Sequence, residues 1–453
     1  MDMRTNVLAA TAALLLAPFA ALGEPIIIDH VTVIDGLGSA PKPEMMVVID
    51  GERIASVSPS ALKENPAGRH IDGRGKFLMP GLMDVHIHLS GSFDPTHPAN
   101  KPGQVYKQVG IGALASFLYA GVTTVYDAGN RPELIVPLRA DERAGKIGAP
   151  RIFATGNLIT YPGSHGAQVG LGIDSWPQAK AALDKHIAEQ RPDMAKLVLE
   201  EEGWGARPLI PIMPVDLLQE TVKYYNQHGI RTTAHVSSEL RSLEAIYAGV
   251  DTLAHPVIQG PVSDSFVKLM AAKKVPFAST LTIGENYGRL VDHPEYLDQP
   301  LYAASLTPQE RQRLKTVVRE DYAKRPWTAW MRVMTPIAME NIRKIDAAGG
   351  IVACGTDQST GAAVHRELEL LVAAGIKPLE VIKIATHNSA VFLGHADDMG
   401  SIEEGKLADL VLLTADPSRD IGSAKAIELV IKGGKLVDFA KLPLPGGRAP
   451  AAR

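Results

Sequence analysis

The chain has a single cysteine among its 453 residues, so no disulfide can form within it, even in an oxidising compartment. This residue, Cys354, lies in the apolar run of residues 351–354. The run predicts a small buried side chain rather than an exposed nucleophile. Thiol catalysis therefore has little support.

A large excess of charge of either sign is also lacking. The sequence has 46 lysines and arginines against 50 aspartates and glutamates, which gives a formal net charge of -4. It offers no basic footprint for nucleic acid and no long charge run for a membrane surface. Hydrophobic residues make up 45% and charged residues 21%, so the chain can build an ordinary core. We expect no nucleic-acid partner.

A hydrophobic run rich in Ala and Leu covers residues 7–22, but it is too short and has too many small residues for a convincing membrane span. Arg4 supplies a short positive region before it, and the small residues Ala21 and Gly23 precede Glu24. This pattern predicts that residues 1–23 are a signal peptide and that the mature protein is secreted or periplasmic, with no membrane attachment after cleavage. The alternative is a buried N-terminal helix.

Both ends of the mature chain are rich in β-forming residues. Short β-rich runs separated by turns fill residues 24–79, and similar runs occur in residues 396–441. Because these two regions flank a long α/β middle, we expect them to form one small β-sandwich domain built from both termini. The Pro- and Gly-rich residues 442–453 read as a loose tail.

The middle of the chain, residues 80–395, alternates candidate strands with helical patterns. The strands are expected at residues 82–89, 123–127, 151–158, 195–199, 232–236, 252–255, 276–283 and 351–355. Repeated strand–helix units predict a (β/α)8 TIM barrel. A doubly wound open sheet is the rival fold, but the strands lack its glycine-rich phosphate turn. Long inserts at residues 91–108, 159–176 and 285–322 follow strands, on the face where barrel enzymes place their active sites.

Six ionisable residues occur on or near these strands. His86 and His88 alternate along the first strand, so both imidazoles would point into the barrel, a pair that suits zinc. The others lie mostly at carboxyl-terminal strand ends, where a barrel collects functional groups: Lys196, His235, His255 and Asp357. Each alone could be a hydrogen-bonded structural residue. Their joint occurrence predicts a metal centre at the barrel mouth.

The sequence around these residues resembles a known family. Residues 80–89 (Pro-Gly-Leu-Met-Asp-Val-His-Ile-His-Leu) resemble the opening metal motif of the amidohydrolase superfamily. Residues 121–125 resemble its second strand, residues 355–357 its last, and residues 400–411 the return into its small β-domain. The chain is most similar to the branch of Xaa-Pro dipeptidase-like and imidazolonepropionase-like hydrolases.

This resemblance implies a site with two divalent metal ions, most simply Zn²⁺. His86, His88 and Asp357 would hold the more buried ion, and His235 and His255 the second. Lys196, carboxylated by CO2, would bridge the two ions. A desolvated lysine has a depressed pKa and a neutral amine that can react in this way. The alternative for Lys196 is a lysine that extends from a strand end to solvent.

The implied reaction is hydrolysis of an amide or peptide C–N bond in a small substrate, such as a dipeptide or an N-acyl amino acid. Two cations that share a water lower its pKa and supply a bridging hydroxide. Asp357 would accept the water's proton and pass it to the leaving nitrogen. Two alternatives stay open: a mononuclear deaminase or cyclic-amide hydrolase of the imidazolonepropionase type, and a non-catalytic secreted binding protein.

Several further residues are weaker candidates. His165 resembles a loop residue that meets the substrate carbonyl in this branch, which would make it catalytic as an oxyanion stabiliser. Tyr161 and Tyr287 are candidate substrate contacts. Asp127 is expected to anchor the barrel, and other histidines are interpreted as surface or helix residues: His97, His387 and His395.

Two features depart from the family pattern. Val-Ser-Ser follows His235, and the insert at residues 285–322 is long and carries charges and prolines. Both lie where specificity would be set, so the substrate stays open. A homo-oligomer is possible from the resemblance alone.

Overall fold

The computed structural model describes residues 24–62, 66–89, 107–200 and 209–447. The expected signal peptide, His97 and nearly all of the insert at residues 91–108 lie outside the described residues.

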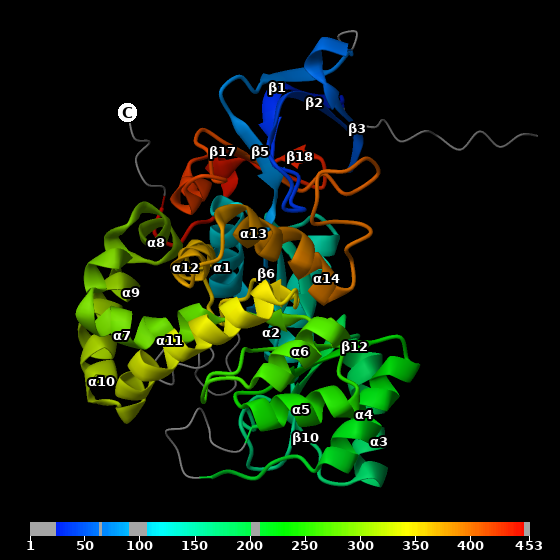
Figure 1. The fold of residues 1–453 in the computed structure, drawn as a ribbon, viewed down its shortest axis with the longest axis vertical. Helices are drawn as coiled ribbons and strands as arrows, with labels where there is room; N and C mark the ends of the chain where they lie inside the picture. Colours follow the sequence, from blue (N-terminus) through cyan, green and yellow to red (C-terminus); the bar gives the residue numbers. More distant parts are fainter. Residues whose placement is uncertain (1–23, 63–65, 90–106, 201–208, 448–453) are drawn as a thin grey trace, which may run out of the picture.

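Eight parallel strands form the centre of the molecule (Figure 1). In chain order they are β6 (Leu82–Ile87), β7 (Val122–Asp127), β8 (Arg151–Ala154), β11 (Met194–Val198), β12 (Arg231–His235), β13 (Thr252–Leu253), β14 (Phe277–Ala278) and β15 (Val352–Ala353). The ring closes where Val85 N donates to Cys354 O at 2.9 Å, and Asp193 N donates to Ala154 O at 3.0 Å between β8 and β11. This is a TIM-barrel-type α/β fold, as predicted.

Helices surround the ring and follow its strands (Figure 1). Local signals set their ends: α5 begins where the Ser238 hydroxyl accepts the Arg241 N–H, and ends at Gly249 with φ 90°. The helices around the barrel are α1 (Lys107–Tyr119), α2 (Pro132–Arg143), α3 (Trp176–Gln190), α4 (Val215–Gln227), α5 (Glu239–Ala248), α6 (Asp264–Lys273), α12 (Gly361–Ala373), α13 (Pro378–Lys383) and α14 (Ser389–Leu393).

The segment between β14 and β15 is a helical excursion on one side of the barrel (Figure 1). It comprises α7 (Leu281–Asp292), α8 (Pro300–Ser305), α9 (Pro308–Arg313), α10 (Arg319–Lys324) and α11 (Pro326–Ala347). The strand predicted at residues 276–283 was too long, because α7 already begins at Leu281. Its first backbone N–H groups donate to the distant Glu367 carboxylate, a contact that local sequence does not reveal. The strand predicted at residues 151–158 likewise ends at Ala154.

Strands from both ends of the chain form one mixed sheet, drawn above the barrel in Figure 1. The order is β18-β17-β16-β5-β1-β2-β3, with β4 beside β1. Their bounds are β1 (Ile26–Val33), β2 (Lys42–Asp50), β3 (Arg53–Pro59), β4 (Arg69–Asp72), β5 (Phe77–Pro80), β16 (Leu410–Leu413), β17 (Ile427–Lys432) and β18 (Lys435–Leu436). Gly81 joins this sheet to the barrel, and a Cβ there would lie 2.1 Å from Thr123 Oγ1, so only glycine fits.

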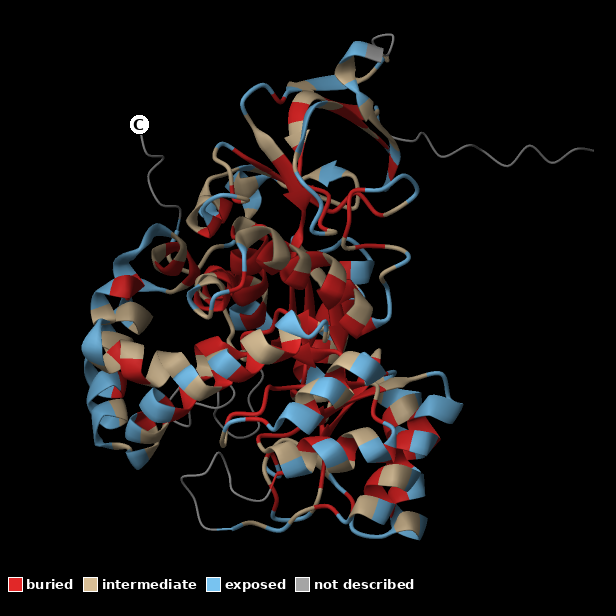
Figure 2. Cartoon of the chain, viewed as in Figure 1, coloured by how far each residue is buried: buried red, intermediate tan, exposed pale blue. Residues whose placement is uncertain are grey.

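Burial follows this architecture. Figure 2 shows buried residues along the barrel strands and exposed residues on the outer faces of the helices. Cys354 is buried, as its apolar run predicts.

At the far end of the described chain, Gly446 N donates to Ala304 O at 3.0 Å. Within the described ranges, no helix has the length and apolar character needed to cross a membrane.

Candidate metal centre

Asp84 fixes the end of β6 against the residues that follow β15. Its carboxylate accepts the Thr356 hydroxyl at 2.6 Å, the Thr356 N–H at 3.1 Å and the His86 N–H at 3.2 Å. The side chain is fully buried, and this desolvation raises its pKa well above the usual range. These contacts set the backbone from which His86 and Asp357 reach the barrel mouth.

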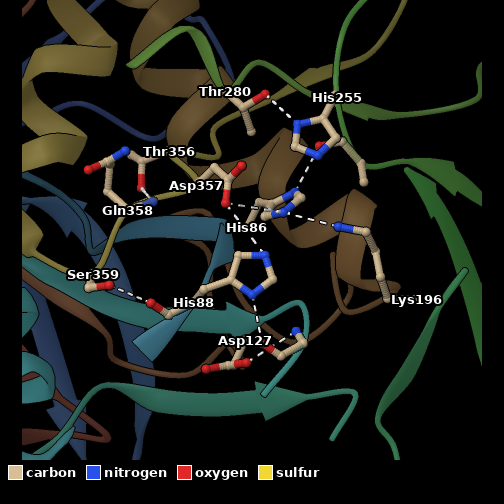
Figure 3. Close-up of polar contacts among 12 residues, drawn as sticks. His86, His88, Asp127, Lys196, His255, Thr280, Thr356, Asp357, Gln358 and Ser359 are labelled. Atoms are coloured by element: carbon tan, nitrogen blue, oxygen red, sulfur yellow. Dashed lines mark hydrogen bonds and ion pairs between the residues drawn. The ribbon is translucent and has the colours of Figure 1, made fainter. Parts of the chain in front are cut away.

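The rings of His86 and His88 are oriented by backbone carbonyls (Figure 3). His86 Nδ1 donates to Ala254 O at 2.8 Å, and His88 Nδ1 donates to Gly129 O at 2.6 Å. Because a carbonyl can only accept, both rings carry the proton on Nδ1 and present Nε2 to the site. Burial lowers the pKa of His86 well below its usual value and that of His88 to about 3, so both rings are neutral.

Asp357 completes a group of three. Its Oδ1 lies 3.5 Å from His88 Nε2 and 3.8 Å from His86 Nε2, and ligand atoms of all three residues lie within 4.8 Å of one another. Asp357 has φ 55°, a left-handed conformation held by its N–H bond to His86 O at 2.8 Å. Within the described ranges, Oδ1 is buried yet accepts no hydrogen bond. Two imidazoles and a carboxylate in this arrangement fit a divalent cation.

Lys196 lies on β11, and its amine points toward His86 from one side of this group (Figure 3). Its Nζ is 3.1 Å from His86 Nε2, and the residue is 2% exposed, so it does not extend to solvent. Desolvation lowers the pKa of the amine to about 7, against the opposing effect of the Asp357 and Asp127 carboxylates. Burial therefore favours the neutral amine, which is the form that can react with CO2.

His235 and His255 lie next to this group. The ring centroid of His255 is 4.4 Å from that of His86 and 4.5 Å from that of His235. His255 Nδ1 is hydrogen-bonded to the Thr280 hydroxyl at 2.9 Å. Burial lowers the pKa of both histidines, so they too are neutral imidazoles that could bind a metal ion. The structure thus brings together all six residues that the sequence singles out.

Of the weaker candidates, His165 contacts the histidine cluster, whereas Tyr161 and Tyr287 pack against other parts of the chain. His165 stacks on His235, with ring centroids 4.5 Å apart and 21° between the planes, so it lies beside the cluster. Tyr161 is half-buried and packs against the barrel core. Tyr287 lies on α7, and its ring packs against Tyr322 and Trp327 of the helical excursion.

Asp127, His387 and His395 have other surroundings. Asp127 accepts the Leu89 N–H at 3.1 Å, the Gly129 N–H at 3.2 Å and the Asn130 amide at 2.9 Å, so it ties together the segments that follow β6 and β7, as expected of an anchor. His395 packs against Phe153, and His387 is half-buried in a helical turn.

Sequence reasoning missed Glu200. It lies just beyond β11, is 1% exposed, and its Oε2 is 3.6 Å from His235 Nε2. The signal was present, because side chains at positions 196, 198 and 200 share one face of an extended segment. A glutamate four residues after Lys196 could therefore have been placed beside it at the barrel mouth.

Comparison with known proteins identifies the family. A model of the Amidohydrolase family matches residues 77–437. The chain belongs to the amidohydrolase family. This amidohydrolase is 24% identical over 392 residues to ochratoxinase from Aspergillus niger, which covers 79% of this chain and 75% of that protein. It is 25% identical over 437 residues to imidazolonepropionase from Shouchella clausii, covering 86% of this chain and 85% of that one.

A solved structure agrees with these relatives. The crystal structure of a prolidase candidate from Bifidobacterium longum superposes with a TM-score of 0.73 at 26% identity, over 92% of this chain and 95% of that one. Together the relatives place the amidohydrolase in the dipeptidase-like and imidazolonepropionase-like branch. The chain is thus a hydrolase that acts on carbon–nitrogen bonds, and a non-catalytic binding protein is no longer an alternative.

Proposed function

We propose that the chain is a binuclear metal-dependent amidohydrolase that cleaves an amide or peptide bond in a small molecule of the dipeptide or N-acyl amino acid class. The observation that carries this proposal is the Lys196 amine, buried and 3.1 Å from His86 Nε2. A buried ammonium beside two imidazoles would be costly, whereas a carboxylated lysine would supply an anionic oxygen ligand there.

The donor set fits two divalent ions such as Zn²⁺. His86, His88 and Asp357 would hold one ion, His235 and His255 the other, and carboxylated Lys196 would bridge them. Neutral imidazoles and carboxylate oxygens are the ligands that Zn²⁺ prefers. The names of the relatives, ochratoxinase and a prolidase candidate, support an amide or peptide bond as the target.

Two such ions, when bound, supply an activated water molecule and Lewis acidity toward a carbonyl. The chain's own residues do the rest. Asp357 directs Oδ1 toward His86 and His88, which leaves Oδ2 to take the proton of the attacking water and return it to the leaving nitrogen. His165, stacked on His235, is placed to donate a hydrogen bond to the carbonyl oxygen as negative charge develops on it.

A second reading, a mononuclear deaminase or cyclic-amide hydrolase, is favoured by one observation. Among the described residues, the group compact enough to hold an ion without rearrangement is His86, His88 and Asp357. In that reading Lys196 would remain an unmodified amine. The name of a relative, imidazolonepropionase, is consistent with this chemistry.

Restoration of metal-free protein separates the two readings. After chelation, amide hydrolysis should return with Zn²⁺ and bicarbonate together, and poorly with Zn²⁺ alone. Only neutral Lys196 reacts with CO2, and burial lowers the pKa of its amine, so at a constant concentration of dissolved CO2 the restoration rate should rise with pH and level off at a pH well below the usual lysine pKa. Full recovery with Zn²⁺ alone, at a rate independent of bicarbonate, would support the mononuclear reading.

His165→Asn tests the oxyanion role. The variant should lower kcat by about 10- to 100-fold, a smaller loss than removal of a dedicated donor because the metal ions also polarise the carbonyl. Metal content should not change, since His165 is not among the proposed ligands. Unchanged turnover of the best substrate would remove His165 from the mechanism.

The chain organisation belongs to the same proposal. Residues 1–23 would be a signal peptide, which makes the mature enzyme secreted or periplasmic. Residues 24–79 and 396–441 would form a small β-sandwich domain beside the barrel of residues 80–395. In support, the mixed sheet has its own apolar cluster, which includes Ile28, Val47, Leu78, Leu410 and Ile431.

A further inference from the structure

His255 differs from the two β6 histidines in what its Nδ1 meets. Backbone carbonyls face Nδ1 of His86 and His88, whereas a hydroxyl, Thr280 Oγ1, lies 2.9 Å from Nδ1 of His255 (Figure 3). A carbonyl can only accept a hydrogen bond, but a hydroxyl can donate or accept. The Thr280 hydroxyl therefore bears on which nitrogen of His255 carries the proton, and hence on whether Nε2 can bind a metal ion.

Thr280 has an unusual backbone conformation. Its φ and ψ are 34° and 38°, in the left-handed region that β-branched residues rarely adopt. It is 4% exposed, and its N–H donates to Gly355 O at 3.0 Å, next to the segment that carries Asp357. Thr280 occupies the position before the first residue of α7, where a threonine hydroxyl usually caps the helix, but its side chain makes no such cap bond.

Glu367 of α12 supplies the missing cap. Its Oε1 accepts the Leu281 N–H at 2.9 Å, and its Oε2 accepts the Thr282 N–H at 2.8 Å as well as the Thr282 hydroxyl. A carboxylate at a helix N-terminus satisfies backbone donors and interacts favourably with the helix dipole. Because Glu367 does this, the Thr280 hydroxyl is available to His255. Thr280 thus connects the α7 N-terminus, which Glu367 caps, to His255 of the proposed metal site.

We propose that Thr280 is a positioning residue whose hydroxyl oxygen accepts the Nδ1–H of His255, so that Nε2 of His255 is the metal-binding nitrogen, with Glu367 holding the turn in place. This inference rests on the proposed metal site, in which His255 holds the second ion. It assigns the left-handed conformation of Thr280 a role in metal binding. Partners that orient a ligand histidine in this way typically contribute 10- to 100-fold to metal affinity.

The experiment is a Zn²⁺ titration of metal-free protein in bicarbonate buffer, with a chromophoric chelator as competitor. Wild type is compared with Thr280→Val, which keeps the shape of the side chain but removes the hydroxyl, and with Thr280→Ser, which keeps the hydroxyl. We expect Thr280→Val to lower the affinity for the second ion by about 10- to 100-fold and to leave the affinity for the first ion unchanged. Thr280→Ser should restore wild-type binding, which a merely structural role for the threonine methyl would not predict.

The other outcomes are equally informative. The inference is overturned if Thr280→Val binds each ion with the same affinity as wild type. It is also overturned if the substitution lowers the affinity for both ions to the same extent. If Thr280→Val does not fold, Thr280→Ala and Thr280→Ser form the deciding pair, and equal affinity in those two overturns it as well. His255→Ala separates this failure from that of the proposed function: if it binds two ions as wild type does, His255 is not a ligand at all.

Discussion

Replacement of Lys196 with alanine should reduce kcat/KM for the best amide substrate by at least about 100-fold, the loss expected when a catalytic metal site loses an essential group. The variant lacks the amine that would carry the carboxylate, so the second ion loses its bridge to the first. The amine lies 3.1 Å from His86 Nε2 in a buried site, so its removal acts directly on the proposed metal centre.

Two controls make this result specific. Lys185→Ala removes a lysine whose side chain is 72% exposed on α3, and it should leave activity and metal content unchanged. Formate or acetate should partly restore the Lys196→Ala variant, because a small carboxylate can enter the space left by the side chain. Wild-type kinetics in Lys196→Ala would contradict the bridging role and favour the mononuclear reading.

Replacement of Asp357 with asparagine should lower kcat by about 10²- to 10⁴-fold, the usual contribution of a positioned acid–base group. Asparagine has nearly the same shape as aspartate, but its amide cannot accept the proton of an attacking water. The substitution should also lower the affinity for the ion proposed at His86 and His88. A neutral oxygen would replace a charged ligand 3.5 Å from His88 Nε2.

Metal content distinguishes these two effects of Asp357→Asn. Activity measured at saturating Zn²⁺ reports the proton transfer, and the Zn²⁺ concentration needed for saturation reports ligation. Asp298→Asn is the matched control, since that side chain is 56% exposed in the helical excursion and should change neither quantity. A variant with full turnover at saturating Zn²⁺ would remove Asp357 as the proton carrier.

Much of this arrangement could be predicted from local patterns in the sequence. Alternation along a strand gave the common direction of His86 and His88, and the strand ends gave the places of His235 and His255. Asp357 could be placed by the same argument, because parallel strands in a barrel deliver their carboxyl ends to one face. These predictions needed only the period of an extended strand and the closure of the ring.

What could not be predicted depends on contacts between distant parts of the chain. The start of α7 at Leu281 depends on Glu367, 86 residues further along the chain, and no local propensity shows this capping contact. The same contact explains why the strand predicted at residues 276–283 was too long, and why Thr280 was not recognised beside His255. The aromatic packing of Tyr287 against Trp327 likewise joins two separate helices, α7 and α11.

The central claim is that this amidohydrolase holds two metal ions linked by Lys196. The most direct test is elemental analysis of mature protein purified without chelator and in the presence of bicarbonate, with Lys196→Ala analysed in parallel. Our account predicts close to two zinc-like ions per wild-type chain and close to one in the variant. Close to one ion in both proteins would contradict it and favour the mononuclear reading.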